Sequence, residues 1–364
     1  MANVYKDSSS GKWISQVKIG YYENGRPKYK RFKSDTKKEA LQRLDEYSFL
    51  EGESNISTAE YIKQYINIYK KNKIKASSLT RDYGILENQI VPKIGDYAIE
   101  ELTSSIIQSE LINKLVDEKY SHSTIHKAYT LLNEALKKAV LENRLSKNPC
   151  VGVNMPSQKS IKPKEIEILT EDEVREFLKV ANIQKYTNGL AISLIVYTGL
   201  RCGELCALKW SDVDFENRTI TVQRNISVSE ITDENGDKKR IVELQDGTKT
   251  RLKRTVPLND KAIEILNKIK AKSKSDFIIQ TKSKVPDTSQ IAKTYNSMIA
   301  YAGIEGRTGI HTLRHTFASV LIKKGVDIKV ISEILGHSSV SFTYKTYIHL
   351  FPEQKTNALD LIDY

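Results

Sequence analysis

The sequence predicts a multidomain protein that is mainly α-helical, with small β-sheets in its first and last units. The chain has 364 residues, more than one ordinary domain holds. The spacing of its apolar residues changes from strand-like alternation to helical periodicity and then to a mixture of both. Polar stretches interrupt this pattern twice. We therefore expect an N-terminal unit, a helical unit, a linker and a C-terminal unit, over residues 1–53, 54–153, 154–165 and 166–364.

The N-terminal unit is expected to form a three-stranded sheet packed on one helix. Residues 12–20 and 27–33 alternate apolar and polar side chains, which is typical of half-buried strands. In the second of these strands, Tyr29 and Phe32 are the side chains expected to anchor the sheet. Residues 36–39 have the Thr-x-x-Glu spacing of a capping box, so a helix should begin there.

Basic residues are concentrated in this first unit. Residues 1–43 hold 11 Lys and Arg against 4 Asp and Glu, within a chain whose net charge is +12. A polyanion is the usual partner of such a surface, and a solvated, solubilising surface is the alternative. Aromatic residues among the basic ones favour contact with DNA. Including the linker, the residues expected to contact DNA are Lys12, Lys18, Arg26, Lys28, Lys30, Arg31, Lys33, Lys159, Lys162 and Lys164.

The middle of the chain has helical spacing throughout. Apolar residues recur three and four positions apart in four segments, which predicts a four-helix unit. The segments are residues 61–66, 79–90, 106–116 and 123–142. The C-terminal unit begins at a second capping box, residues 170–173, and is expected to mix helices with short strands over 219–222 and 254–258.

Composition argues against several classes of protein. The longest apolar run, residues 190–196, is too short to cross a membrane, and the first residues lack the apolar core of a signal peptide. We therefore expect a cytoplasmic protein with no membrane partner. The cysteines Cys150, Cys202 and Cys206 form no CxxC pair, so buried thiols are expected rather than disulfides or a metal site.

The first of three polar patterns in the C-terminal unit surrounds Arg201. Gly199 ends an apolar helix and Arg201 opens the next one. An arginine at that position adds to the partial positive charge of the helix N-terminus, so we expect an anion to lie there. Glu204, one turn further on, would support the guanidinium group. A surface ion pair between Arg201 and Glu204 is the alternative.

The second pattern is the run from His311 to His315. His311 and Arg314 lie three residues apart on one helix and together could bind a phosphate and titrate near it. His311 and His315 also have the spacing of a zinc pair. However, residue 312 is threonine where zinc proteases carry glutamate, and an arginine stands between the histidines, which disfavours a cation. His315 is interpreted as a core histidine or as one behind the site.

The third pattern is Gly336-His337, followed by Tyr347 ten residues after the histidine, with Tyr344 as its competitor. Arginine, then His-x-x-Arg, then Gly-His, then tyrosine is an ordered set that resembles the tyrosine recombinase family of phage-type integrases. The three-unit layout is similar to that of the arm-binding integrases of phages and integrative conjugative elements. In them a small sheet domain binds arm sites, and a helical domain and a catalytic domain clamp the core site.

The resemblance implies a site-specific DNA recombinase that cuts and rejoins DNA through a 3′-phosphotyrosine and so integrates or excises a mobile element. It also implies a role for each matching residue. Arg201 and Arg314 would bind the phosphate, with Glu204 as support, His311 would act as base or phosphate ligand, and His337 would donate a hydrogen bond to a phosphate oxygen. Tyr347 would be the nucleophile, and the β-hairpin lysine Lys249 would protonate the leaving 5′ oxygen. Lys253 is the alternative to Lys249.

The implied partners are double-stranded DNA with core and arm sites, a homotetramer on that DNA, an excisionase and a host DNA-bending protein. The last residues, 354–364, would dock on a neighbouring subunit or fold back on their own. No cofactor and no metal is expected, because two arginines and two histidines can stabilise the phosphate charge and no P-loop is found. The location would be the bacterial cytoplasm, on the nucleoid when bound. The alternatives are a type IB topoisomerase and a DNA-binding regulator without the reaction.

Overall fold

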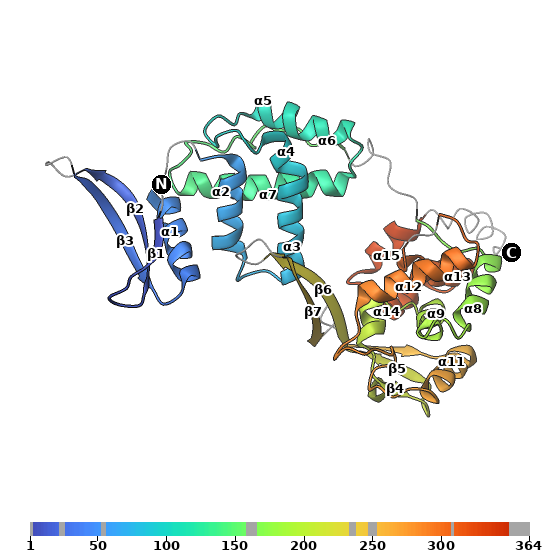
Figure 1. The fold of residues 1–364 in the computed structure, drawn as a ribbon. Helices are drawn as coiled ribbons and strands as arrows, with labels where there is room; N and C mark the ends of the chain where they lie inside the picture. Colours follow the sequence, from blue (N-terminus) through green and yellow to red (C-terminus); the bar gives the residue numbers. More distant parts are fainter. Residues whose placement is uncertain are drawn as a thin grey trace. The chain divides into compact units, whose positions relative to one another are not determined.

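The computed structural model of the chain describes residues 3–21, 26–51, 56–157, 166–232, 238–246, 253–306 and 309–348. Four of the predicted site residues lie outside these ranges: Lys159, Lys162, Lys164 and Lys249. The chain divides into two compact units, one of residues 1–164 with 230–239 and one of residues 165–229 with 240–364 (Figure 1).

The N-terminal part of the first unit is the predicted sheet and helix. Its antiparallel strands follow the order β1-β2-β3, and the elements are β1 Asn3–Lys6, β2 Trp13–Tyr21, β3 Pro27–Ser34 and α1 Lys37–Glu51. The hydroxyl of Ser15 in β2 donates a 2.6 Å hydrogen bond to the carbonyl of Ala40, which ties the sheet to α1. Thr36 caps the helix through the backbone N–H of Glu39, as predicted.

The prediction that Tyr29 anchors the sheet is wrong. Its side chain is 38% exposed, and Phe32 is only partly buried. The reason is that Tyr29 lies on the face of β3 opposite to α1, where side chains of this strand face solvent. The buried residues between the sheet and α1 are instead Ser15, Ser34, Ala40 and Leu44, and Ile14 is buried on the other face of the sheet.

The four predicted helices are present in the rest of the first unit, and three of them contain a π-helical stretch. They are α2 Thr58–Tyr65 with η1 Ile66–Lys70; α3 Ala76–Ile85 with η2 Leu86–Ile90 and α4 Val91–Ile94; α5 Ser104–Ile106 with η3 Ile107–Asn113 and α6 Lys114–Asp117; and α7 His122–Leu141. Side chains of Ser57, Thr103 and Ser121 cap their N-termini. The apolar faces of the helices pack into one core that is distinct from the core of the second unit.

The second unit surrounds the apolar helix α9, most of whose residues are buried. Helices α8, α11, α12 and α13 pack against α9. Their bounds are α8 Glu171–Ala181, α9 Gly189–Thr198, α10 Cys202–Ala207, α11 Asp260–Lys270, α12 Thr288–Tyr301, α13 His311–Lys323, α14 Ile328–Leu335 and α15 Val340–Tyr347. The capping box at Thr170 and Glu173 forms as predicted.

One small sheet completes this unit, and a second has most of its residues here, with residues 230–232 and 238–239 in the first unit. The antiparallel sheet β4-β5-β8 contains both strands predicted from the sequence, and β6 and β7 form a two-stranded sheet. The elements are the short helix η4 Trp210–Asp212 and the strands β4 Val213–Asp214, β5 Thr219–Val222, β6 Arg224–Thr232, β7 Lys238–Asp246 and β8 Arg254–Pro257. The mainly helical fold class with small sheets is therefore confirmed.

Two expectations from composition can be compared with the structure. Cys150, Cys202 and Cys206 are buried free thiols, as predicted. Across the residues that the structure describes, none of the helices is both long enough and apolar enough to span a membrane.

Candidate active site

The site is built on the C-terminal ends of two helices, α9 and α14. Both helices end at a glycine in the left-handed region, Gly199 with φ 63° and Gly336 with φ 64°. A Cβ at Gly199 would lie 2.5 Å from the Phe317 ring, and one at Gly336 would lie 2.9 Å from Arg254, so both positions require glycine. Backbone carbonyl groups at these ends carry the partial negative charge of a helix C-terminus, which attracts cations.

Arg314, from α13, fills the space between the two ends. It is only 5% exposed, and its guanidinium donates hydrogen bonds of 2.6 Å to the Gly199 carbonyl and 2.7 Å to the Leu335 carbonyl. No carboxylate among the described residues forms an ion pair with it. Burial, and next the charge of Arg201, lower the pKa of Arg314 to about 9. A buried cation without a carboxylate is costly, so the site favours a bound anion.

A second cation lies beside it in an arginine–glutamate–arginine group. Glu204 is 2% exposed and accepts from the Arg201 side chain at 2.8 Å and from the Arg201 backbone N–H at 2.9 Å. Arg254 donates to both oxygens of the same carboxylate, at 2.9 and 2.7 Å. Burial alone would raise the pKa of Glu204, but the hydrogen bonds and charge of Arg254, together with the charge of Arg201, lower it to about 2.

This group bears on two predictions, the support of Arg201 by Glu204 and the presence of an anion at the start of α10. Glu204 does support Arg201, and its carboxylate is the anion that occupies the start of α10. Arg201 also donates to the carbonyl of Gly336 at 3.1 Å, and Arg254 donates to that of Ile334 at 2.8 Å, so the same helix end holds both guanidinium groups. The sequence did not single out Arg254, which is the first residue of β8 and follows several other basic residues.

His337 completes the polar side of the site. Its Nε2 lies 3.0 Å from an N–H group of Arg314, and a guanidinium can only donate, so Nε2 accepts. The ring proton is therefore on Nδ1, which donates to the Thr343 hydroxyl at 2.7 Å. Burial, followed by the charges of Arg314 and Arg201, lowers the pKa of His337 to about 3, which keeps the ring neutral.

Tyr347, at the end of α15, lies on the apolar side. It is 1% exposed and belongs to a small core cluster with Ile331 and Leu335. Its hydroxyl lies 2.7 Å from Nδ1 of His315. Burial raises the pKa of Tyr347 to about 12, against the opposing effect of Arg314. Its competitor Tyr344 is 48% exposed, so the two tyrosines differ in environment although only three residues separate them.

His315 was expected in the core or behind the site, and the structure places it in direct contact with Tyr347. Of the other predicted residues, His311 is the exposed first residue of α13, and Lys253, the alternative to Lys249, is exposed before β8. Within the described ranges, no group of three or more His, Cys, Asp or Glu side chains could hold a metal ion.

The predicted DNA-contacting residues of the first unit lie mainly on β3. Because side chains alternate between the faces of a strand, Tyr29, Arg31 and Lys33 share one face, and the register pairs Lys33 with Ile14. This face is opposite to that of Ser15, which bonds to α1. The side chain of Lys18 lies outside the described residues. The exposed predicted residues are Lys12, Arg26, Lys28, Lys30, Arg31 and Lys33.

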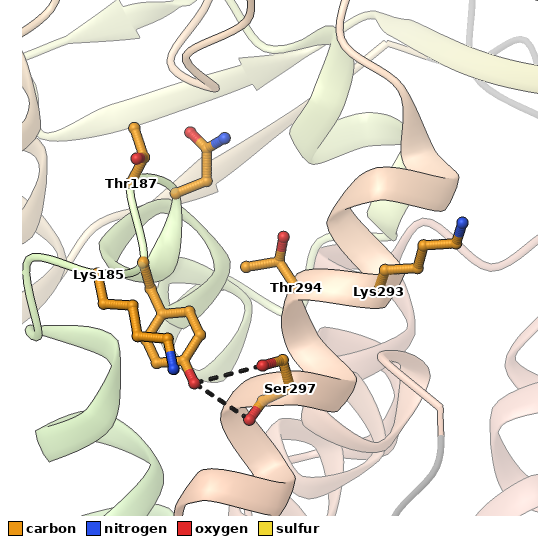
Figure 2. Close-up of a pocket in the computed structure, with 7 residues that line it drawn as sticks. Lys185, Thr187, Lys293, Thr294 and Ser297 are labelled. Carbon is orange, nitrogen blue, oxygen red and sulfur yellow. Dashed lines mark hydrogen bonds between the residues drawn. The ribbon is translucent and has the colours of Figure 1, made fainter.

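An open pocket of about 370 Å³ lies at the other end of α9, beside α12 (Figure 2). Its lining includes Lys185 and Lys293, and the hydroxyl of Tyr186 donates to the carbonyl of Ser297 at 3.2 Å. Asn188, the residue before α9, also lines it. None of its lining residues belongs to the arginine and histidine group described above.

Comparison with known proteins gives a consistent result. Residues 167–354 match the phage integrase family, and residues 59–116 match the N-terminal SAM-like domain of phage integrases. A tyrosine recombinase XerC-like protein of Caldanaerobacter subterraneus subsp. tengcongensis is 32% identical over an alignment of 376 positions, gaps included, which covers 95% of this chain and 94% of that protein. The ICEBs1 integrase of Bacillus subtilis is 25% identical over 288 residues, 74% of either chain.

Solved structures share the fold. The Tn1549 transposon integrase (residues 82–397) in complex with a circular intermediate DNA has a TM-score of 0.67 at 20% identity, and the likeness covers 84% of this chain and all of that one. A lambda integrase tetramer bound to a Holliday junction has a TM-score of 0.59 at 20% identity, with 93% of this chain and 96% of that one covered.

Proposed function

The chain belongs to the phage integrase family of tyrosine recombinases, and from that premise we propose that Arg314, Arg201 and His337 hold the scissile phosphate while Tyr347 attacks it. The enzyme catalyses site-specific DNA recombination. The two alternatives, a type IB topoisomerase and a regulator without the reaction, are not favoured by these relatives.

One observation carries the assignment of the phosphate site. Arg314 is a buried cation whose partners in the described chain are carbonyl groups and a neutral imidazole ring, none of which carries a full negative charge. A phosphodiester anion would supply that charge. Arg201 lies close enough to lower the pKa of Arg314, so the same anion would relieve the repulsion between the two guanidinium groups.

The chemistry follows from this arrangement. Attack by the tyrosine oxygen on phosphorus adds negative charge to the non-bridging oxygens, and fixed cations stabilise that charge. The phosphotyrosine keeps the energy of the broken phosphodiester, so rejoining needs no nucleotide. The departing 5′ oxygen needs a proton, and we assign its donation to Lys249. His311 would contact the phosphate from the exposed start of α13.

The role proposed for His337 requires a change of tautomer. In the arrangement described above, Nε2 accepts from Arg314 and the proton is on Nδ1. A hydrogen bond from Nε2 to a phosphate oxygen needs the proton on Nε2 instead. When the phosphate takes over the N–H group of Arg314, Nε2 is released from accepting, and the Thr343 hydroxyl can donate to Nδ1.

The partners proposed are double-stranded DNA and further copies of the chain. The basic face of β3 would contact arm sites, and the helical and C-terminal units would enclose the core site, over the domain boundaries predicted from the sequence. The lambda integrase tetramer on a Holliday junction supports a tetrameric assembly. We also propose that an excisionase and a host DNA-bending protein take part, and that the protein acts in the cytoplasm. Residues 354–364 would dock on a neighbouring subunit or fold back on their own.

The nucleophile is tested with Tyr347→Phe and Tyr344→Phe on a nicked suicide substrate, which traps the covalent intermediate. Tyr347→Phe should bind core DNA with unchanged affinity and form no adduct, because the attacking oxygen is absent. Tyr344→Phe, three residues earlier on the same helix, is the matched control and should form adduct. The opposite pattern would overturn the assignment, and an adduct in neither variant would show that both hydroxyls are needed.

A further inference from the structure

The hydroxyl of Tyr347 has a histidine as its hydrogen-bond partner within the described residues. Nδ1 of His315 lies 2.7 Å from the tyrosine oxygen. The two rings meet edge to face, with centroids 5.8 Å apart. His315 is fixed on α13, the helix that also carries Arg314, whereas Tyr347 is on α15. The contact therefore joins the tyrosine oxygen to the helix that supplies the main phosphate-binding arginine.

The direction of this hydrogen bond follows from the pKa values of both groups. Burial first, and then the charges of His311 and Arg314, lower the pKa of His315 to about 4. The pKa of Tyr347 is raised to about 12 by burial. At neutral pH the phenol therefore keeps its proton and donates it to Nδ1, and the proton of the neutral histidine ring is on Nε2.

Two other polar groups of the site are less suited to take this proton. Arg314 can only donate. Both ring nitrogens of His337 are engaged, Nε2 by Arg314 and Nδ1 by Thr343. His311, the residue to which the family resemblance gave the role of base, is exposed at the first turn of α13.

We propose that His315 is the general base of DNA cleavage, the group that takes the phenol proton when Tyr347 attacks. This rests on the proposed function, in which Tyr347 is the nucleophile. The Oη–H bond breaks and its proton passes to Nδ1, while Oη forms a bond to phosphorus. The bond from phosphorus to the 5′ oxygen breaks, and that oxygen takes a proton from a separate donor. His315 is then an imidazolium, which returns its proton to the phenol oxygen on rejoining.

Binding of DNA would strengthen this base. The charge of Arg314 is one of the causes that keep His315 neutral. A phosphodiester held by Arg314 offsets that positive charge, so the imidazolium form becomes easier to reach. The base thus becomes effective when the substrate is in place, and the phenol stays protonated in the free protein.

The test uses two substitutions at one position. His315→Leu removes the hydrogen-bond acceptor. His315→Asn keeps an acceptor close to the position of Nδ1, but an amide cannot take a proton. A general base accelerates a reaction by about 10²- to 10⁴-fold. Both variants should therefore cleave the suicide substrate more slowly by about this factor. If His315 only positions the tyrosine, His315→Asn will cleave like the wild type, and the proposal is wrong.

A second arm changes the phenol. A fluorinated tyrosine introduced at position 347 ionises more readily and depends less on a base. It should restore most of the cleavage lost in His315→Asn and should not restore cleavage in Arg314→Ala, which lacks the phosphate ligand. Absence of rescue in His315→Asn would overturn the proposal.

Core-site binding and thermal unfolding of each variant separate these effects from misfolding, and the conclusion rests on His315→Asn if His315→Leu does not fold. Loss of the adduct in Tyr347→Phe is the independent check of the nucleophile. An adduct that persists there would refute the proposed function, whereas failure of the His315 experiments with Tyr347 upheld would refute the base alone.

Discussion

Two neutral histidines beside arginines make the stability of the second unit depend on pH. Burial is the main reason that the pKa of His315 falls to about 4 and that of His337 to about 3, from an ordinary value of 6.5. In the unfolded chain both rings take up protons below about pH 6.5, whereas in the folded chain they do not. The contribution of these two histidines to the free energy of unfolding is therefore highest above pH 6.5 and decreases as the pH falls toward 4 and then 3.

Urea unfolding between pH 7 and pH 5 measures this effect. Each histidine should contribute at most about 1.4 kcal/mol per pH unit below 6.5, and His337 less, because solvent screens its partly exposed ring. The double variant His315→Asn, His337→Asn should lose most of this slope. Glu204 does not interfere, because its pKa of about 2 lies below an ordinary value of 4.5, so it changes stability only at lower pH. An unchanged slope in the double variant would contradict the prediction.

At the scale of single residues, the sequence predicted most of the site residues, because their order along the chain is a recognisable pattern. Arg201, Glu204, Arg314 and His337 do lie together. The contact of His315 with Tyr347 was not predictable, since 32 residues separate the two and nothing in their spacing brings them together. The same holds for Arg254, which reaches Glu204 across 50 residues. The side on which a histidine ring carries its proton also depends on such partners.

The glycine that ends α9 should tolerate no side chain. Gly199→Ala forces a residue with a Cβ into a left-handed conformation, at about 1–2 kcal/mol, and places that Cβ 2.5 Å from the Phe317 ring. Relief of this clash should cost a further ~1–3 kcal/mol. Because the Gly199 carbonyl holds Arg314, DNA cleavage should fall as well.

Gly303→Ala is the matched control. Gly303 follows α12 and has a φ of 70°, and a Cβ at this position would meet no atom within 4 Å, so only the backbone cost applies. Urea unfolding should show a larger loss for Gly199→Ala, and the suicide substrate should show slower cleavage for that variant alone. Equal losses of stability and normal cleavage by both variants would show that the Phe317 contact relaxes freely.

The positions of helices were predicted more completely than the positions of strands and the burial of strand side chains. Capping residues and apolar spacing are local signals, and they located α1, α7, α8 and the end of α9. Strand β1 was expected only as part of a three-stranded sheet and was not located, because four residues are too few to show alternation. The exposure of Tyr29 depends on which face of the sheet α1 covers, and side-chain alternation along one strand does not tell which face that is.

The N-terminal sheet and helix should bind arm-site DNA as a module that can be removed without loss of core-site cleavage. A shortened protein that begins at Ile56 lacks the sheet with Arg31 and Lys33, and with it 11 of the 57 Lys and Arg residues. It should cleave a core site and lose arm-site binding. Its affinity should also fall less steeply with salt, since each phosphate contact contributes about −0.9 to the slope of log K against log salt concentration. Unchanged arm-site binding would exclude the module.

A substitution within the full chain supports this experiment. Arg31→Gln with Lys33→Gln removes two charges from the face of β3 and should weaken arm-site binding and reduce its salt slope. Lys261→Gln with Lys268→Gln removes the same charge from exposed ion pairs on α11 and is the control. Similar losses in both double variants would mean that overall charge is sufficient.

At the scale of the molecule, the sequence predicted the order of the units because composition changes sharply along it. The boundaries at residues 53, 153 and 165 stay predictions. How the units close around DNA depends on partners and on surfaces that one chain does not specify.

The helix ends that hold the arginines also affect the thermodynamics of DNA binding. A free arginine side chain has about 2 kcal/mol of rotamer entropy, which it loses when it grips a ligand. Arg201, Arg254 and Arg314 already donate to backbone oxygens at the ends of α9 and α14. That entropy is therefore lost during folding, before any phosphate arrives. The guanidinium groups of Arg201 and Arg314, which are proposed to hold the phosphate, should be as well ordered in the free protein as on DNA, and their contacts should contribute undiminished to affinity.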